Sequence, residues 1–131
     1  MRTLMLVLIG VVLLSATISN PERTRIPTVS ADTVTLREVR RGSELGAVTD
    51  LDDSPDTLLV ERPVDAREGA TSSVFVVVDE DGVLLRRVRV EYGRASPSLI
   101  QIVSGVSAGD RIIVSDMRAW DAFDRLRLRL R

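Results

Sequence analysis

Residues 73–131 consist of short strand-like stretches separated by turns of only a few residues. Residues 74–78 form an uninterrupted run of valine and phenylalanine, which is typical of a strand covered on both faces. Residues 87–92 instead alternate strictly between charged and apolar side chains, which predicts a strand with one apolar face. That face comprises Val88, Val90 and Tyr92. Because the connections are too short for crossover helices, neighbouring strands are predicted to be antiparallel.

Local signals extend this prediction along the chain. Residues 79–82 are predicted to form a hairpin turn in which Gly82 supplies a positive φ. Residues 116–124 are predicted to form a helical turn that Asp116 caps. Further strands are expected at residues 33–40, 58–60, 99–103, 111–115 and 126–131. Together these elements predict an all-β fold, a small antiparallel β-roll or barrel-like domain.

The N-terminal segment differs, because residues 3–19 form the one long uncharged stretch of the chain. As a helix this stretch would be roughly 26 Å long, a little short of a hydrocarbon core of about 30 Å. Arg2 precedes it, so a signal anchor and a cleaved signal peptide both fit. The lack of an A-x-A-like cleavage site favours an uncleaved anchor over a cleaved peptide or a buried core helix. The predicted organisation is an anchor at residues 1–20, a linker with one strand and an acidic loop at 21–57, and a β domain at 58–131.

Composition excludes most kinds of catalytic site. The chain contains no Cys, His or Lys, and its 18 basic residues are all arginine. This excludes thiol, triad and Schiff-base catalysis together with tetrahedral zinc, haem and iron–sulfur sites. A formal net charge of −1 argues against a protein that coats nucleic acid. We therefore expect no enzymatic activity, no cofactor, no metal and no nucleic-acid partner.

The acidic features have ordinary structural explanations. Residues 50–61 imitate a calcium-binding loop, but Pro55 occupies the position that needs a positive φ, so a solvated loop is predicted. Two carboxylate pairs lie in predicted turns, where aspartate bonds nearby backbone. These pairs are Asp79 with Asp81, and Asp121 with Asp124.

The C-terminal residues 125–131 alternate arginine with leucine. Such a strand could meet anionic lipid or nucleic acid, but the few aromatic residues offer no stacking platform for bases. The favoured interpretation is an outer strand whose arginines face solvent. Its leucines are then expected to face the core, namely Leu126, Leu128 and Leu130.

Motifs in the C-terminal half carry a resemblance to a known family. Residues 92–94 read YGR, residues 100–117 read IQIVSGVSAGDRIIVSDM, and residues 115–128 read SDMRAWDAFDRLRL. This portion resembles the C-terminal part of periplasmic adaptor subunits (membrane fusion proteins, HlyD-like) of bacterial efflux pumps. The ending is most similar to adaptors that serve ABC-type exporters. Residues 59–63 resemble the strand that leads into that domain.

The resemblance implies a specific arrangement. Residues 26–29 and 34–42 resemble the family's start just after its membrane anchor, so residues 33–40 are expected to supply an edge strand that packs with the C-terminal strands. In the family this membrane-proximal domain meets the inner-membrane transporter. The family also inserts a lipoyl-like domain, a long α-helical hairpin and a β-barrel, where only residues 44–57 stand in this chain.

We therefore expect a non-enzymatic, single-pass inner-membrane protein whose domain lies in the periplasm and binds an exporter permease, the ABC type being favoured. The expected contacts are Arg87 and Arg89, exposed on one strand face, and the corner of Arg118 and Trp120, although Trp120 also suits a core position. A homo-oligomer is compatible with this interpretation. Two alternatives stay open. One is a truncated adaptor without a partner, and the other is a carboxylate-dependent envelope hydrolase, which needs a pocket with two facing carboxylates.

Overall fold

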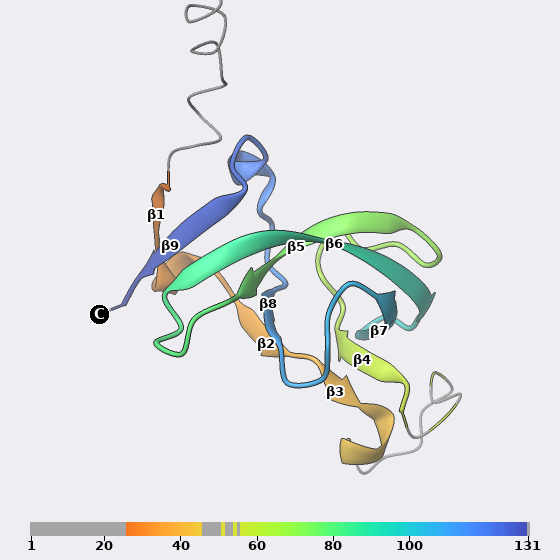
Figure 1. Cartoon of the computed structure of the whole chain (residues 1–131). Coiled ribbons are helices and arrows are strands. Elements are labelled where there is room, and N and C mark those ends of the chain that lie inside the picture. The colour runs from red at the N-terminus through yellow and green to blue at the C-terminus, as the bar shows by residue number, and fades with distance from the viewer. Residues whose placement is uncertain (1–25, 46–50, 52–53, 55, 131) are drawn as a thin grey trace, which may run out of the picture.

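The computed structural model describes residues 26–45, 51, 54 and 56–130, which form an all-β domain (Figure 1). The predicted all-β, barrel-like fold class is confirmed, and the strands at residues 71–77, 84–95 and 99–104 pair antiparallel in succession as predicted. The strands at residues 111–113 and 125–129 pair instead with strands that are not their neighbours in the chain. The predicted anchor at residues 1–20 lies outside the described residues, and no helix within the described part is long and apolar enough to cross a membrane. The strands and 3-10 turns (η) are β1 (Thr28–Ser30), η1 (Ala31–Thr33), β2 (Leu36–Glu38), β3 (Arg40–Arg41), η2 (Gly42–Glu44), β4 (Leu58–Glu61), β5 (Thr71–Val77), β6 (Leu84–Ala95), β7 (Leu99–Ser104), β8 (Arg111–Ile113), η3 (Arg118–Trp120) and β9 (Arg125–Arg129).

The main sheet bends into a nearly closed barrel. Its strands follow the order β2-β8-β5-β6-β7-β4-β3, which places β2 and β3 at its two ends. In the chain, however, only Val39 separates these two strands. Val39 is completely buried, its amide donates to the carbonyl of Asp110 at 2.8 Å, and its carbonyl accepts from the amide of Gly109 at 2.7 Å. One residue thus joins the two ends of the sheet, which corrects the expectation that residues 33–40 form a simple edge strand.

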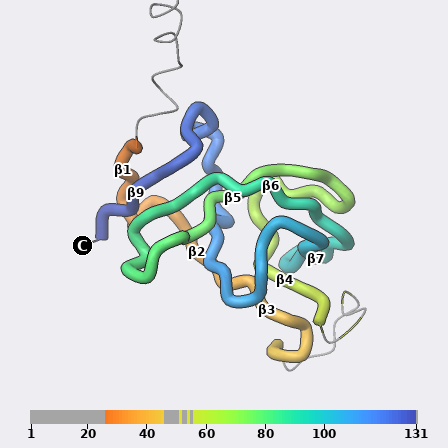
Figure 2. The backbone as a smooth tube through the Cα atoms, in the orientation of Figure 1, coloured from red at the N-terminus to blue at the C-terminus, as the bar shows by residue number. Residues whose placement is uncertain are grey.

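The first and last described strands lie side by side, as the tube in Figure 2 shows. β1 pairs in parallel with β9, with Thr28 opposite Arg127. β9 in turn pairs antiparallel with the start of β6, where Leu126 lies opposite Leu85. The sequence does not predict the parallel pair, because local alternation identifies strands without showing which distant strands meet. This pairing ties the N-terminal segment to the end of the chain.

Two apolar clusters lie on opposite faces of β5. Val74 and Val76 point into the barrel, whereas Phe75 points into the second cluster, so the prediction of a strand covered on both faces is confirmed for these residues. It is wrong for Val78, which follows the end of β5 and is 45 % exposed. The barrel interior contains Val39, Val60, Ala66, Val74, Val76, Val90, Tyr92, Ile100, Ile102, Ile112 and Val114. The second cluster contains Val29, Phe75, Leu85, Ile113, Leu126 and Leu128, with Val34, Leu36, Val77, Met117, Trp120 and Phe123 packed against it.

The β5–β6 hairpin turns as predicted. Gly82 has a φ of +74°, in the region that favours glycine. The carboxylate of Asp79 accepts hydrogen bonds from the amides of Val83 at 3.0 Å and Leu84 at 2.9 Å. The turn role predicted for Asp79 is therefore confirmed.

The outer strand β9 follows its predicted alternation only in part. Leu126 and Leu128 are buried in the second cluster, as expected. Leu130 is 55 % exposed, because β9 ends at Arg129 and the next residue has left the strand. The inward position predicted for Leu130 is therefore wrong.

Candidate functional site

The connection between β8 and β9, residues 114–124, crosses the outer face of β5 and β6; we call it the crossover (Figure 1). β8 pairs with β5 only at Ile112 and Val76, whereas β9 pairs with the edge of β6 that faces away from β5. The chain must therefore pass over the sheet between these two strands. The crossover positions most of the predicted contact residues, because it carries η3 and covers part of β6.

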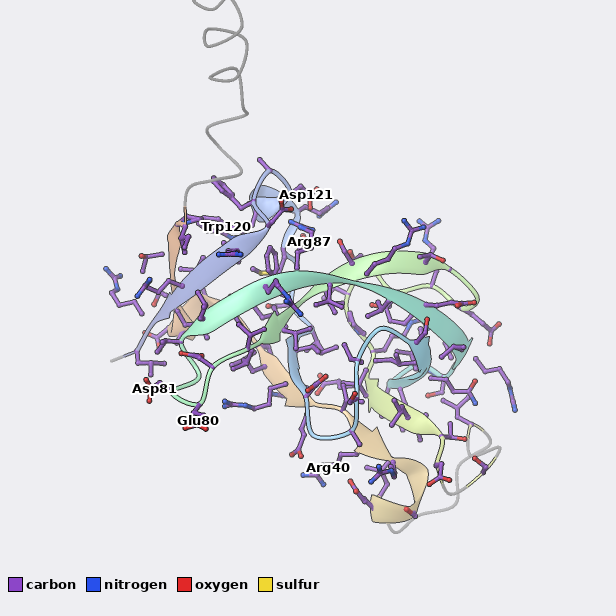
Figure 3. The ribbon with its side chains drawn as sticks, viewed as in Figure 1. Arg40, Glu80, Asp81, Arg87, Trp120 and Asp121 are labelled. Carbon is purple, nitrogen blue, oxygen red and sulfur yellow. The ribbon has the colours of Figure 1, made fainter. Side chains whose placement is uncertain are left out.

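Arg87 projects from β6 beneath the crossover (Figure 3). Its guanidinium lies 4.5 Å from the ring centroid of Phe75. Its Nε donates to the carbonyl of Phe123 at 3.0 Å, and its Nη2 donates to the carbonyl of Trp120 at 2.8 Å. Its Nη1 donates to Oγ of Ser73 at 3.0 Å. Only 20 % of the Arg87 side chain is exposed, so the prediction of an exposed Arg87 is wrong: the crossover covers the charged face of the strand at this point.

Arg89 lies two residues further along the same face of β6, opposite Ser73 in the register. Its side chain is exposed, as predicted. The Arg89 side chain makes no hydrogen bond or ion pair with another residue in the described part of the chain. On this charged face of β6, the crossover therefore covers Arg87 and leaves Arg89 exposed to solvent.

Arg118 begins η3 and presents a charge to solvent, with 79 % of its side chain exposed. Its guanidinium donates to both carboxylate oxygens of Asp116, from Nε at 3.0 Å and from Nη2 at 2.7 Å. The backbone amide of Arg118 also donates to Asp116 at 3.0 Å, so Asp116 supports the turn, although Met117 holds the N-cap position. These hydrogen bonds lower the pKa of Asp116 to about 2, and they raise the pKa of Arg118.

Trp120 ends η3 and is half-buried. Its ring centroid lies 6.1 Å from that of Phe123, with the two planes tilted by 49°, and both rings pack against the second apolar cluster. One part of the Trp120 side chain packs on the core and another reaches solvent. Its position therefore fits both roles that the sequence suggests, a core residue and a partner contact.

A pocket of about 250 Å³ lies beneath the crossover. Its lining includes Arg87, Arg118 and two carboxylates, those of Asp65 and Asp121. The arginines are engaged with other groups, whereas neither carboxylate is hydrogen-bonded or ion-paired within the described residues. The pocket can therefore accommodate one polar side chain or small polar group beside two carboxylates.

Sequence patterns do not bring these carboxylates together. Asp65 belongs to the loop between β4 and β5, and Asp121 was notable only as a partner of Asp124. In the structure Asp124 lies 3.9 Å from Nε of Arg87, while Asp121 lines the pocket. Only the path of the crossover places Asp65 and Asp121 at one site. Within the described residues no group of acidic side chains could hold a metal ion, and residues 50, 52, 53 and 55 of the calcium-like loop lie outside them.

Tyr92 carries a second polar group that the sequence does not single out. Its ring is buried in the barrel, on the predicted apolar face of β6. Its hydroxyl has no hydrogen-bond partner among the described residues. Burial, with a smaller contribution from the charge of Asp65, raises the pKa of Tyr92 to about 12.

The predicted contact residues thus divide by role. Arg87 and Trp120 hold the crossover against the sheet, whereas Arg89 and Arg118 present guanidinium groups to solvent. Of the two exposed residues, Arg118 also lines the pocket. No family profile, curated protein or solved structure matches the chain.

Proposed function

We propose that the chain is a membrane-anchored, non-enzymatic adaptor-like module that binds the extracytoplasmic part of an inner-membrane exporter permease, the ABC type being favoured. Residues 1–20 would form the anchor and the β domain would lie in the periplasm. The observation that carries the proposal is the pairing of N-terminal with C-terminal strands, β1 with β9 and β2 with β8. The resemblance implies the same return of the N-terminal segment to the end of the domain.

The position of the crossover supports this proposal. Residues 21–25 would link the anchor to Ile26, and at about 3.5 Å per residue they span at most roughly 20 Å. Val29 of β1 and Trp120 of the crossover belong to the same apolar assembly. An anchor would therefore hold the crossover close to the membrane, on the side from which a permease is reached.

Arg118 is the contact residue best suited to a test, because its exposed side chain contributes little to the core. Arg118→Ala in the tagged full chain is expected to lower co-purification of the permease from the membrane fraction severalfold, with only a small fall in the unfolding midpoint from loss of the exposed ion pair with Asp116. Arg40→Ala is the matched control, since Arg40 is half-exposed and lies far from the crossover (Figure 3). Equal permease recovery with both variants would place the contact elsewhere, and recovery of no permease with the unaltered chain would favour a truncated adaptor without a partner.

A carboxylate-dependent envelope hydrolase is the second candidate, because the pocket beneath the crossover contains Asp65 and Asp121. General acid–base hydrolysis requires two such groups around one bond. This candidate predicts that the purified chain hydrolyses isolated envelope glycans, and that Asp65→Asn and Asp121→Asn each abolish the hydrolysis. The adaptor proposal predicts no hydrolysis by the unaltered chain.

A further inference from the structure

Four exposed arginines form a surface that we call the arginine stripe. Three of them alternate along β9 with Leu126 and Leu128, whose burial in the second cluster turns the arginines to the opposite face. The fourth comes from the neighbouring strand β6, and cross-strand partners share a face. The stripe consists of Arg86, Arg125, Arg127 and Arg129, all exposed.

The stripe has no counter-charge of its own. Arg86 lies directly opposite Arg125, an arrangement of like charges that disfavours strand pairing. The other cross-strand partners of the stripe are uncharged, namely Leu84, Val76, Thr28 and Ser30. No hydrogen bond from a stripe guanidinium and no ion pair to a carboxylate is present within the described residues.

Four exposed arginines elsewhere in the domain are ion-paired, whereas Arg67, Arg89 and Arg111 are exposed without an ion pair among the described residues. Arg37 pairs with Glu61, Arg40 with Glu38, Arg41 with Glu44 and Asp56, and Arg118 with Asp116. Within the described residues, only the β9 face brings together two unpaired arginines as direct cross-strand partners, Arg86 and Arg125. Such a surface is complementary to a polyanion.

The position of the stripe favours an anionic membrane as that polyanion. β1 lies along β9, and the carbonyl of Pro27 accepts a hydrogen bond from the amide of Arg127 at 2.9 Å. The chain outside the described part joins this ribbon at Ile26, and it contains the uncharged stretch of residues 3–19. The short linker therefore keeps the stripe near the membrane surface, where anionic headgroups attract arginine strongly within about 10 Å.

We infer that the arginine stripe docks the domain on anionic phospholipid headgroups of the membrane that holds residues 1–20. The inference rests on the anchor of the proposed function and adds a second attachment, which fixes the orientation of the barrel. Each arginine that reaches an anionic surface favours docking by about fivefold. Removal of two stripe arginines should thus lower the ratio of docked to undocked domains roughly 25-fold.

The test uses the full chain reconstituted in vesicles of phosphatidylcholine, with or without phosphatidylglycerol. The chain lacks cysteine, so Thr28→Cys gives a single attachment site for a fluorophore on the face of the stripe. Headgroup-spin-labelled lipid then quenches the fluorophore only when the stripe lies at the surface. We expect strong quenching in anionic vesicles, weak quenching in zwitterionic ones, and loss of the difference at high salt.

Two double variants with the same change of charge complete the test. Arg125→Gln with Arg127→Gln should abolish the extra quenching, whereas Arg40→Gln with Arg41→Gln, in β3, should preserve it. Equal quenching in both lipids or an equal loss in both double variants would overturn the inference. Quenching that falls as the number of chains per vesicle rises would also overturn it, because a second copy would then cover the stripe. Flotation tests the anchor separately: a chain that floats with anionic but not zwitterionic vesicles contradicts the anchor and supports the stripe.

Discussion

The guanidinium of Arg87 lies 4.5 Å from the ring centroid of Phe75, its direct cross-strand neighbour in β5. This contact places a charged group over the second apolar cluster. The same guanidinium donates hydrogen bonds to the carbonyls of Trp120 and Phe123. One side chain of β6 thus connects the sheet to the crossover and fixes the position of the corner that carries Arg118.

Replacement of Arg87 should destabilise the domain. Arg87→Met keeps the apolar stem over Phe75 but leaves the carbonyls of Trp120 and Phe123 without their donor. We expect the free energy of unfolding to fall by about 2–3 kcal/mol, since unsatisfied polar groups in a partly buried site are costly. Denaturant unfolding followed by the fluorescence of Trp120, the only tryptophan, measures this change.

Arg89→Met is the matched control for that experiment. Arg89 lies on the same face of the same strand but is exposed, so its replacement should change stability by less than about 0.5 kcal/mol. Equal effects of the two substitutions would show that Arg87 does not hold the crossover.

The contrast between these arginines shows what the sequence could predict. Strict alternation correctly assigned residues 87–92 to a strand and placed Val90 and Tyr92 in the core. It could not show that a connection more than 25 residues further along the chain covers Arg87 and leaves Arg89 exposed. The same limit applies to Val39, which has charged neighbours in the sequence but joins the two ends of the sheet. It also applies to Asp65, because the pocket that Asp65 lines is formed only where the crossover passes over the sheet.

Two glycines with positive φ should respond differently to alanine. Gly105 has a φ of +111°, and a Cβ there would overlap the carbonyl oxygen of Arg89. Gly69 has a φ of +73° with open space around the added Cβ. Gly69→Ala should cost only the conformational term of about 1 kcal/mol, whereas Gly105→Ala should cost about 3 kcal/mol because the backbone must also move. Thermal unfolding of both variants checks the order, and an equal cost would contradict the close approach at Gly105.

The ion pair at the corner predicts a pH response. Hydrogen bonds from Arg118 hold the pKa of Asp116 at about 2, below its ordinary value of 3.8. A lowered carboxyl pKa contributes stability above 3.8, and this contribution is lost as the pH falls through 2. In Arg118→Ala the pKa of Asp116 should return toward 3.8, as followed by carboxyl NMR titration. An unchanged Asp116 titration would show that the pair does not form in solution.

Ionisation of Tyr92 should make the stability of the domain depend on pH at the alkaline end, whereas Asp116 does so at the acidic end. Burial raises its pKa from 10.0 to about 12, so the folded state disfavours the phenolate. The resulting stability is complete below pH 10 and is lost as the pH rises toward 12. Tyr92 is the only tyrosine, so phenolate absorbance reports this group alone. A midpoint near 10 in the folded protein would contradict its burial.

Removal of the Tyr92 hydroxyl tests its environment independently. Because the hydroxyl has no hydrogen-bond partner among the described residues, Tyr92→Phe removes a desolvated polar group without breaking a bond. The free energy of unfolding should rise by about 1 kcal/mol. A loss of stability in denaturant unfolding would instead reveal a hydrogen-bond partner in solution.

Site-specific crosslinking in living cells tests the proposed function most directly. A photoreactive amino acid in place of Arg118, in the full chain expressed in its native host, is expected to form an adduct with an exporter permease. The same amino acid in place of Arg40, which lies far from the crossover (Figure 3), should form none. A folded, membrane-associated chain that yields no permease adduct from position 118 would contradict the adaptor proposal.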